Sequence, residues 1–214
     1  YNTQQIIAAM RAQAVAGTKL LCLPEFTLTG YTCSDLFLQE TLLEGALDAL
    51  NTVCRETAEL AAVIVVGLPL RVRGKLYNVA AVVNAGDVLA FVPKTHLPNY
   101  SEFYEQRHFV SADTLSGGME SVDIKNADGE TVCVPLVTDT IFQCDEQPLF
   151  TFGVEICEKE DVVTYAKKLQ ERGARNVLIS MAGDGAVLVA EDGSVYQAEA
   201  PEGKLINSVG AGDS

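Results

Sequence analysis

The sequence is poor in the residues that build metal centres and nucleic-acid interfaces. It has no tryptophan, only two histidines, and six cysteines. No two of these cysteines are separated by just two residues, so the sequence predicts no structural zinc site. Its 15 basic residues are outnumbered by 29 acidic ones, which gives a net charge of -14. A chain this acidic repels phosphate backbones. We therefore expect no metal and no general affinity for nucleic acid, although a local anion site built from backbone N–H groups stays open.

Long apolar runs are missing as well. No apolar stretch approaches the roughly 18 to 20 residues that a membrane-spanning helix requires. Residues 1–5 contain neither the basic nor the apolar region of a secretory signal peptide. The scattered cysteines are then expected to be reduced thiols in a cytoplasmic protein. Apolar residues still make up 48% of the 214 residues, enough for the core of one large domain or two small ones.

The pattern of apolar residues predicts an α/β class, in which helices alternate with strands. Helical spacing predicts helices over 2–17, 40–60 and 160–172, with Gly173 as the C-cap of the last one. Short apolar runs predict strands at 19–23, 61–70, 75–84, 88–92, 131–137, 149–156, 176–180, 186–190 and 195–198. Residues 94–109 are polar, aromatic and aperiodic, so we expect a loop there.

Three segments place a reactive side chain at the end of an apolar strand, where α/β sheets commonly present their chemistry. They are residues 23–26, 92–100 and 152–158, which contain Glu25, Lys94 and Cys157. A cysteine nucleophile needs a base to accept its proton and a cation or N–H donor to stabilise an oxyanion. The three residues can supply these parts. Each residue alone, however, is more commonly a solvated turn residue, a surface charge or a buried thiol.

The segments around these residues resemble the nitrilase-like glutaminase domain of glutamine-dependent NAD synthetases. The resemblance runs from about residue 1 to residue 158 and is densest over 92–107, Val-Pro-Lys-Thr-His-Leu-Pro-Asn-Tyr-Ser-Glu-Phe-Tyr-Glu-Gln-Arg. It implies an incomplete nitrilase-type layered sandwich of sheets and helices. It also implies site roles: Glu25 as general base, Lys94 as oxyanion stabiliser, Cys157 as nucleophile, and Tyr31, Tyr100 and Glu158 as glutamine contacts.

This resemblance implies hydrolysis of glutamine through a thioester. Glu25 deprotonates Cys157, the thiolate attacks the side-chain amide, ammonia leaves, and water releases glutamate. In the family's whole enzymes the ammonia passes to a synthetase domain that uses ATP and Mg²⁺ to amidate deamido-NAD. No sequence resembling that domain is present here, and the glutaminase part implies no cofactor and no metal.

A second set of motifs lies in residues 159–214. Residues 180–186, Ser-Met-Ala-Gly-Asp-Gly-Ala, and 207–214, Asn-Ser-Val-Gly-Ala-Gly-Asp-Ser, are glycine-rich. Such turns let backbone N–H groups approach a phosphate, although most Gly-x-Gly-Asp tetrapeptides are ordinary turns. The full segment resembles the C-terminal part of PfkB (ribokinase-family) sugar kinases such as 1-phosphofructokinase or tagatose-6-phosphate kinase, and implies a ribokinase-like α/β fragment. It further implies ATP and Mg²⁺ as cofactors, Asp213 as catalytic base, an anion hole of Gly210, Ala211 and Gly212, and Gly183 and Gly185 near the nucleotide.

The two resemblances meet near residue 158 without a linker, so we expect two parts, 1–158 and 159–214. Each part lacks segments of its family, and the chain therefore looks like pieces of two enzymes joined together. A designed chimera, a fragmentary gene prediction and an assembly error are all open as its origin. The main interpretation is a glutaminase with impaired turnover, and the alternatives are a sugar-phosphate kinase fragment and a non-catalytic α/β chimera. Glutamine is the expected partner, a membrane is not, and homo-oligomerisation is left open.

The junction carries a structural prediction of its own. The strand at 149–156 presents an apolar edge unless residues 175–190 pair with it. Parallel pairing after the helix at 160–172 would form a β-α-β unit of the usual right hand. The helices at 2–17 and 40–60 are expected on one face of the first sheet.

Overall fold

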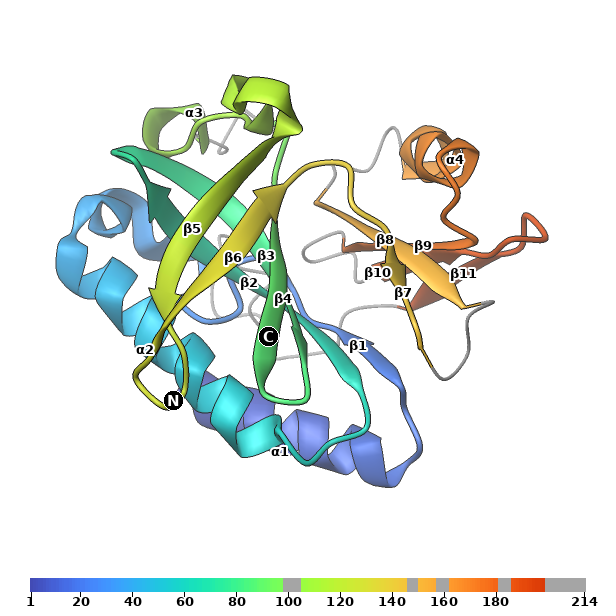
Figure 1. The fold of residues 1–214 in the computed structure, drawn as a ribbon, viewed down its shortest axis with the longest axis horizontal. Helices are drawn as coiled ribbons and strands as arrows, with labels where there is room; N and C mark the ends of the chain where they lie inside the picture. Colours follow the sequence, from blue (N-terminus) through green and yellow to red (C-terminus); the bar gives the residue numbers. More distant parts are fainter. Residues whose placement is uncertain (98–104, 146–149, 157–161, 181–185, 199–214) are drawn as a thin grey trace.

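A computed structural model of the chain describes residues 1–97, 105–145, 150–156, 162–180 and 186–198. Within these ranges two sheets pack face to face, with helices α1 and α2 outside the first sheet and helix α4 outside the second (Figure 1). This arrangement confirms the α/β class and the layered sandwich of sheets and helices. None of the helices in the described ranges has the length and apolar character that crossing a membrane requires.

The first sheet has six strands in the order β1-β2-β3-β4-β6-β5. The strands are β1 (Leu20–Cys22), β2 (Val63–Val72), β3 (Lys75–Asn84), β4 (Asp87–Pro93), β5 (Met119–Lys125) and β6 (Thr131–Val137). Strand β1 pairs with β2 in parallel, whereas β2, β3 and β4 are antiparallel neighbours. The strands expected between residues 19 and 137 are therefore confirmed.

Helices α1 (Asn2–Val15) and α2 (Glu40–Thr57) cover one face of this sheet. Met10 of α1 and Leu50 and Val53 of α2 are buried in one cluster with Val66 and Leu68 of β2. Burying an apolar side chain of this size stabilises the fold by about 1.5–3 kcal/mol. The amphipathic spacing in the sequence thus predicted both helices and their common face.

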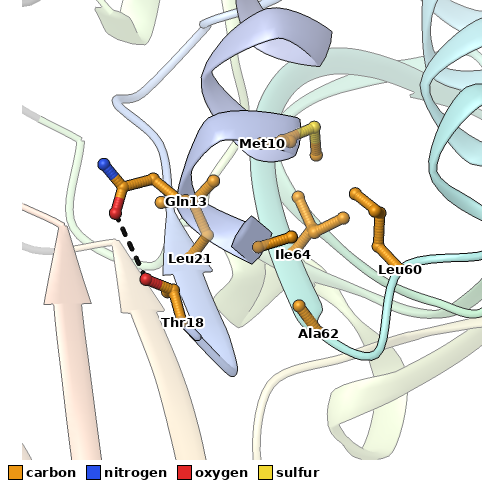
Figure 2. A pocket seen from close by; sticks show the side chains of 8 residues that line it. Met10, Gln13, Thr18, Leu21, Leu60, Ala62 and Ile64 are labelled. Atoms are coloured by element: carbon orange, nitrogen blue, oxygen red, sulfur yellow. Dashed lines mark hydrogen bonds between the residues drawn. The ribbon is translucent and has the colours of Figure 1, made fainter. Parts of the chain in front are cut away.

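Figure 2 shows a small cavity where α1 crosses β1 and β2, with Met10, Leu60 and Ile64 close together. The Thr18 hydroxyl donates a hydrogen bond to the Gln13 side-chain oxygen, 3.2 Å away, at the rim. The cavity measures about 10 Å³, which is the size of one water molecule at most. It is a gap in the packing and is too small to hold a substrate.

The second sheet has five strands in the order β11-β10-β9-β8-β7. They are β7 (Phe142–Gln143), β8 (Thr151–Ile156), β9 (Asn176–Ser180), β10 (Ala186–Val189) and β11 (Val195–Ala198). Strand β8 pairs with β9 in parallel, from Phe152 opposite Asn176 to Ile156 opposite Ser180. Strand β9 of the kinase-like segment therefore pairs with β8 of the glutaminase-like part, as we predicted for the junction.

Helix α4 (Val162–Glu171) lies between β8 and β9 in sequence and covers the outer face of the second sheet. Ala166 and Leu169 are buried against Val177 and Ile179 of β9. The helix ends at Glu171, and Gly173, two residues later, has a φ of 109° and donates its N–H to the Gln170 carbonyl at 3.0 Å, which agrees with the predicted C-cap glycine.

The inner faces of the two sheets form a separate apolar cluster. Val65 and Val92 of the first sheet are buried with Phe152, Val154 and Ile156 of β8. Strand β8 alternates, because Gly153, between two residues of this cluster, faces Leu169 of α4. One strand therefore contributes to both interfaces of its sheet.

One segment differs from the sequence prediction, and another has a structure that the sequence did not predict. The region 94–109, expected as a loop, contains the helix α3 (Glu105–His108), and residues 31–38 form the kinked 3₁₀ segment η1 (Tyr31–Leu38). Short 3₁₀ helices η2 (Ala112–Thr114) and η3 (Ser116–Gly118) follow. A helix of four residues has no apolar period to detect, and tertiary contacts of its side chains hold it in place.

Candidate active site

Glu25 lies in the turn that follows β1. The Leu28 N–H donates to the Gly67 carbonyl of β2 at 3.2 Å, which fastens the turn to the strand. A Cβ atom at position 67 would lie 2.4 Å from the backbone nitrogen of Phe26. Only glycine permits so close an approach of the two backbones. The result is that the Glu25 side chain is directed into the protein, where it is 7% exposed.

An aromatic cluster anchors the same turn. Phe26 is buried, with its ring centroid 4.9 Å from that of Phe37 and 5.1 Å from that of Phe109. Its backbone adopts a φ of 53°, and this left-handed conformation costs a non-glycine residue roughly 1–2 kcal/mol. Burial of the Phe26 ring offsets that cost and holds the neighbouring Glu25 in position.

Lys94 directly follows β4 and is buried between two carboxylates. Its Nζ lies 2.9 Å from Glu25 Oε1 and 2.9 Å from Glu105 Oε1, and all three side chains are at most 7% exposed. The backbone of Lys94 is fixed too, because its N–H donates to the Asn78 carbonyl at 2.8 Å. The structure thus brings together two of the three catalytic residues predicted for the glutaminase site.

The network extends to two further side chains. The Tyr31 hydroxyl donates to Glu105 Oε1 at 2.7 Å. The Asn78 amide nitrogen donates a short hydrogen bond to Glu25 Oε1 and lies 3.5 Å from Glu105 Oε2. Tyr31, expected to contact glutamine, is therefore a partner of Glu105 in this structure.

Sequence reasoning missed Glu105 and Asn78. Glu105 lies within the motif at 92–107, but the sequence alone does not distinguish it as a site residue from Glu102 in the same motif. Asn78 interrupts the apolar run of β3 and is 1% exposed. A polar residue in the middle of an apolar strand was a usable signal, because a buried amide needs hydrogen-bond partners.

The charges of this network are unequal, since two carboxylates share one ammonium. Burial acts to lower the pKa of Lys94, but attraction to Glu25 and Glu105 outweighs it and raises the pKa above its ordinary value. Burial, followed by repulsion from Glu25, raises the pKa of Glu105 to about 7, against the opposing effect of Lys94. Lys94 therefore stays a cation, while Glu105 gains and loses its proton near neutral pH.

All the other predicted site residues lie outside the described residues: Tyr100, Cys157, Glu158, Gly183, Gly185, Gly210, Ala211, Gly212 and Asp213. The nearest described neighbour of Cys157 in the chain is Ile156, the last residue of β8. Ile156 is buried in the same cluster as Val92, which lies two residues before Lys94.

The described residues contain no group of three or more His, Cys, Asp or Glu side chains arranged to hold a metal ion. No disulfide joins the cysteines in these ranges. Burial, together with the charge of Asp87, raises the pKa of the Cys54 thiol to about 12, so Cys54 is protonated and unreactive at neutral pH. Cys133 is exposed.

Comparison with known sequences finds two kinds of relative. The chain is 41% identical over 157 residues to the glutamine-dependent NAD(+) synthetase of Mycobacterium tuberculosis, which covers 73% of this chain and 22% of that protein. It is 57% identical over 63 residues to the 1-phosphofructokinase of Bacillus subtilis, which covers 29% of this chain and 20% of that protein. Residues 137–214 match the pfkB family carbohydrate kinase model. The chain thus spans about a fifth of the length of these two relatives.

Solved structures show the same fold over most of the chain. A glutamine-dependent NAD(+) synthetase from Cytophaga hutchinsonii superposes with a TM-score of 0.72 at 23% identity, covering 92% of this chain and 37% of that one. A nitrilase-superfamily amidase from Nesterenkonia AN1 superposes with a TM-score of 0.61 at 16% identity, covering 92% of this chain and 80% of the amidase.

The structural match is longer than the sequence match to the synthetases. It extends over 92% of the chain, so it includes part of the segment that is similar in sequence to the kinases. The chain therefore combines sequence similarity to glutamine-dependent NAD(+) synthetases and to pfkB family carbohydrate kinases within one nitrilase-like fold.

Proposed function

We propose that this chain carries a glutamine amidohydrolase site of the nitrilase type. The observation that supports it most is the buried network in which Lys94 bridges Glu25 and Glu105, 2.9 Å from an oxygen of each. Buried ionisable groups with shifted pKa values are typical of catalytic sites. The position of Ile156, packed with Val92 at the inner face of the first sheet, supports the placement of Cys157 beside this network.

In the proposed reaction, Glu25 accepts the proton of the Cys157 thiol, and the thiolate attacks the side-chain carbonyl carbon of glutamine. Lys94 stabilises the negative charge that develops on the carbonyl oxygen, a role that suits a cation whose pKa is raised. The proton held by Glu25 passes to the leaving ammonia and a thioester forms. Water then attacks the thioester, releasing glutamate and restoring the thiol.

The proposal places ammonia production in this chain and its use elsewhere. The relatives are named glutamine-dependent NAD(+) synthetases, so we propose amidation of deamido-NAD as the use of the ammonia. ATP and Mg²⁺ would act in that synthetase step and not at Glu25, Lys94 and Cys157. The cytoplasm is the proposed location of both steps.

Turnover demands more than an assembled network. Positioning of substrate to within about 1 Å decides the rate of such reactions, and residues after Cys157 resemble a kinase instead of the glutaminase family. We therefore expect this chain to react with a glutamine analogue at Cys157 but to hydrolyse glutamine slowly.

A labelling experiment tests the proposal. The chain is treated with iodoacetamide or with a glutamine-like diazoketone, and mass spectrometry compares Cys157 with Cys133, an exposed thiol in the same molecule. Cys157 should react fastest, and Glu25→Gln or Lys94→Ala should slow it while leaving Cys133 unchanged. Glu44→Gln, at an exposed position of α2, is the control for removal of a carboxylate.

Faster labelling of Cys133, Cys22 or Cys54 with no modification of Cys157 would contradict the proposal. The site would then be unassembled, and the similarity would describe ancestry alone.

The second candidate is a sugar-phosphate kinase, favoured by the match of residues 137–214 to the pfkB family. By resemblance Asp213 would be its base and residues 210–212 its anion hole, with Gly183 and Gly185 near ATP and Mg²⁺. ATP-dependent phosphorylation of fructose 1-phosphate or tagatose 6-phosphate tests this function. Phosphorylation of either sugar phosphate, or micromolar ATP binding by calorimetry, would favour this second function, and the absence of both would favour the glutaminase.

A further inference from the structure

Asn78 is the one amide among the buried polar residues of the described chain, which are Thr57, Asn78, Lys94 and Glu105. It lies on β3, between β2 and β4 in the first sheet (Figure 1). Its backbone carbonyl accepts the Lys94 N–H at 2.8 Å, and its side-chain nitrogen donates to Glu25 Oε1. One residue thus fixes the backbone of Lys94 and the carboxylate of Glu25.

The amide of Asn78 is oriented with its nitrogen toward the carboxylates of the network. The amide nitrogen also lies 3.5 Å from Glu105 Oε2, so both carboxylates are on its donor side. The amide oxygen, by contrast, is buried and has no hydrogen-bond partner among the described residues. A flipped amide would turn this oxygen toward Glu25, where two acceptors would repel each other unless Glu25 carried a proton.

Two carboxylates beside one ammonium carry an excess negative charge, so one of them can bind a proton. The proposed reaction depends on which of the two carboxylates binds it. A general base must be ionised, so the proton must stay off Glu25. Tyr31 and Lys94 both donate to Glu105 Oε1, while Lys94 and Asn78 both donate to Glu25 Oε1. Asn78 donates to Glu25 Oε1, whereas its amide nitrogen lies 3.5 Å from Glu105 Oε2, at the limit of a hydrogen bond, so the amide favours charge on Glu25.

We propose that Asn78 is a positioning residue of the glutaminase site, which holds Glu25 as the ionised carboxylate and leaves the shared proton to Glu105. This inference rests on the proposed function, because it matters only if Glu25 is the base for Cys157. Among the described residues, the charged and titratable groups facing Glu25 are Lys94 after β4 and Glu105 of α3, and Tyr31 of η1 acts through Glu105.

The test measures the rate of Cys157 labelling against pH in the full chain. Asn78→Leu removes the donor while keeping a side chain of similar length. Its midpoint of labelling against pH should rise by about one unit, so labelling at a pH below both midpoints should slow about tenfold. Asn84→Leu, at the other end of the same strand, should leave the midpoint unchanged. An unchanged midpoint in Asn78→Leu, with Glu25→Gln still slow, would overturn the role of Asn78 alone.

A measurement on the unsubstituted chain covers the case in which Asn78→Leu fails to fold. The side-chain amide resonances of Asn78, followed by ¹⁵N NMR, should shift with the same midpoint as Cys157 labelling. Glu25→Gln should remove this shift, and any shift that remains should follow the proton of Glu105. Asn78 amide resonances whose chemical shifts do not change with pH would overturn the inference. If Glu25→Gln instead labels at Cys157 as fast as the unsubstituted chain, the proposed function itself fails, which is a separate outcome.

Discussion

The two sheets of this molecule bury charge in different ways. The first sheet encloses Glu25, Lys94 and Glu105 as a hydrogen-bonded set in which every carboxylate touches the ammonium. The second sheet holds a half-buried acid, Glu155 on β8, whose pKa rises to about 7 because of its partial burial and the charge of Asp139, only partly opposed by Lys168. In the first arrangement opposite charges are in direct contact, whereas in the second partial burial disfavours the ionised form of Glu155.

This difference explains how one fold can accommodate sequences similar to two families. Pairing of β8 with β9 needs only backbone groups in register, and the cover by α4 needs only an apolar stripe such as Ala166 and Leu169. Many sequences meet those needs. The network around Lys94 requires particular side chains at fixed distances, so the junction can preserve the sandwich without preserving turnover.

The largest expected effect comes from breaking the network of the first sheet. Lys94→Met removes the cation and leaves two buried carboxylates, which should destabilise the chain by about 3–5 kcal/mol at pH 8. The loss should shrink below pH 5, because protonation then neutralises the carboxylates. Denaturant unfolding at both pH values measures it, with the exposed Lys125→Met as control. A loss below about 1 kcal/mol would mean that the network is not buried in solution.

A smaller effect is expected from the turn that holds Glu25. In Gly67→Ala the new Cβ would meet the Phe26 nitrogen at 2.4 Å, a backbone atom that must move. We expect a loss of about 2–3 kcal/mol and slower labelling of Cys157. Gly45→Ala, in the middle of α2 with nothing within 4 Å of its new Cβ, should instead stabilise the chain by roughly 0.5–1 kcal/mol. Equal unfolding curves for the two variants would refute the close approach.

The smallest expected effect concerns Glu155 in the second sheet. The pKa of Glu155 is raised from 4.5 to about 7. The contribution of its protonated form to the stability of the fold is therefore full below the pKa of the unfolded chain and is lost as the pH rises through 7. Glu155→Gln should therefore be more stable than the unsubstituted chain at pH 8, by about 1–2 kcal/mol, and equal to it near pH 4. Thermal melts at the two pH values, with Glu44→Gln as control, measure this. A gain that persists at pH 4 would show that charge is not its cause.

Much of the sandwich could be predicted from the sequence, because apolar periodicity reports which residues are buried. It predicted the shared face of α1 and α2, the β2–β3–β4 meander and the parallel pairing of β8 with β9. It could not predict η1 or α3, whose few residues are held by contacts distant in sequence, such as the hydrogen bond between Tyr31 and Glu105.

The site was predicted in part. Glu25 and Lys94, which are 69 residues apart, were paired by resemblance and meet at 2.9 Å. Glu105 and Asn78 escaped because their roles depend on which side chains meet in three dimensions. The roles of Cys157, Asp213 and the glycine loops stay predictions, as does the cytoplasmic location.

Strand β8 has a consequence for how enzymes exchange segments. The sequence matches to the synthetase and to the kinase family together exceed the length of the chain, so they share residues, and β8 lies within the kinase match. A strand with an apolar row on its inner face, and with Gly153 against the helix on its outer face, offers the same pairing edge to whatever chain follows. A recombinant chain joined at such a strand can fold even when it has lost its activity. We therefore expect strand ends of this kind to be crossover points between unrelated α/β enzymes.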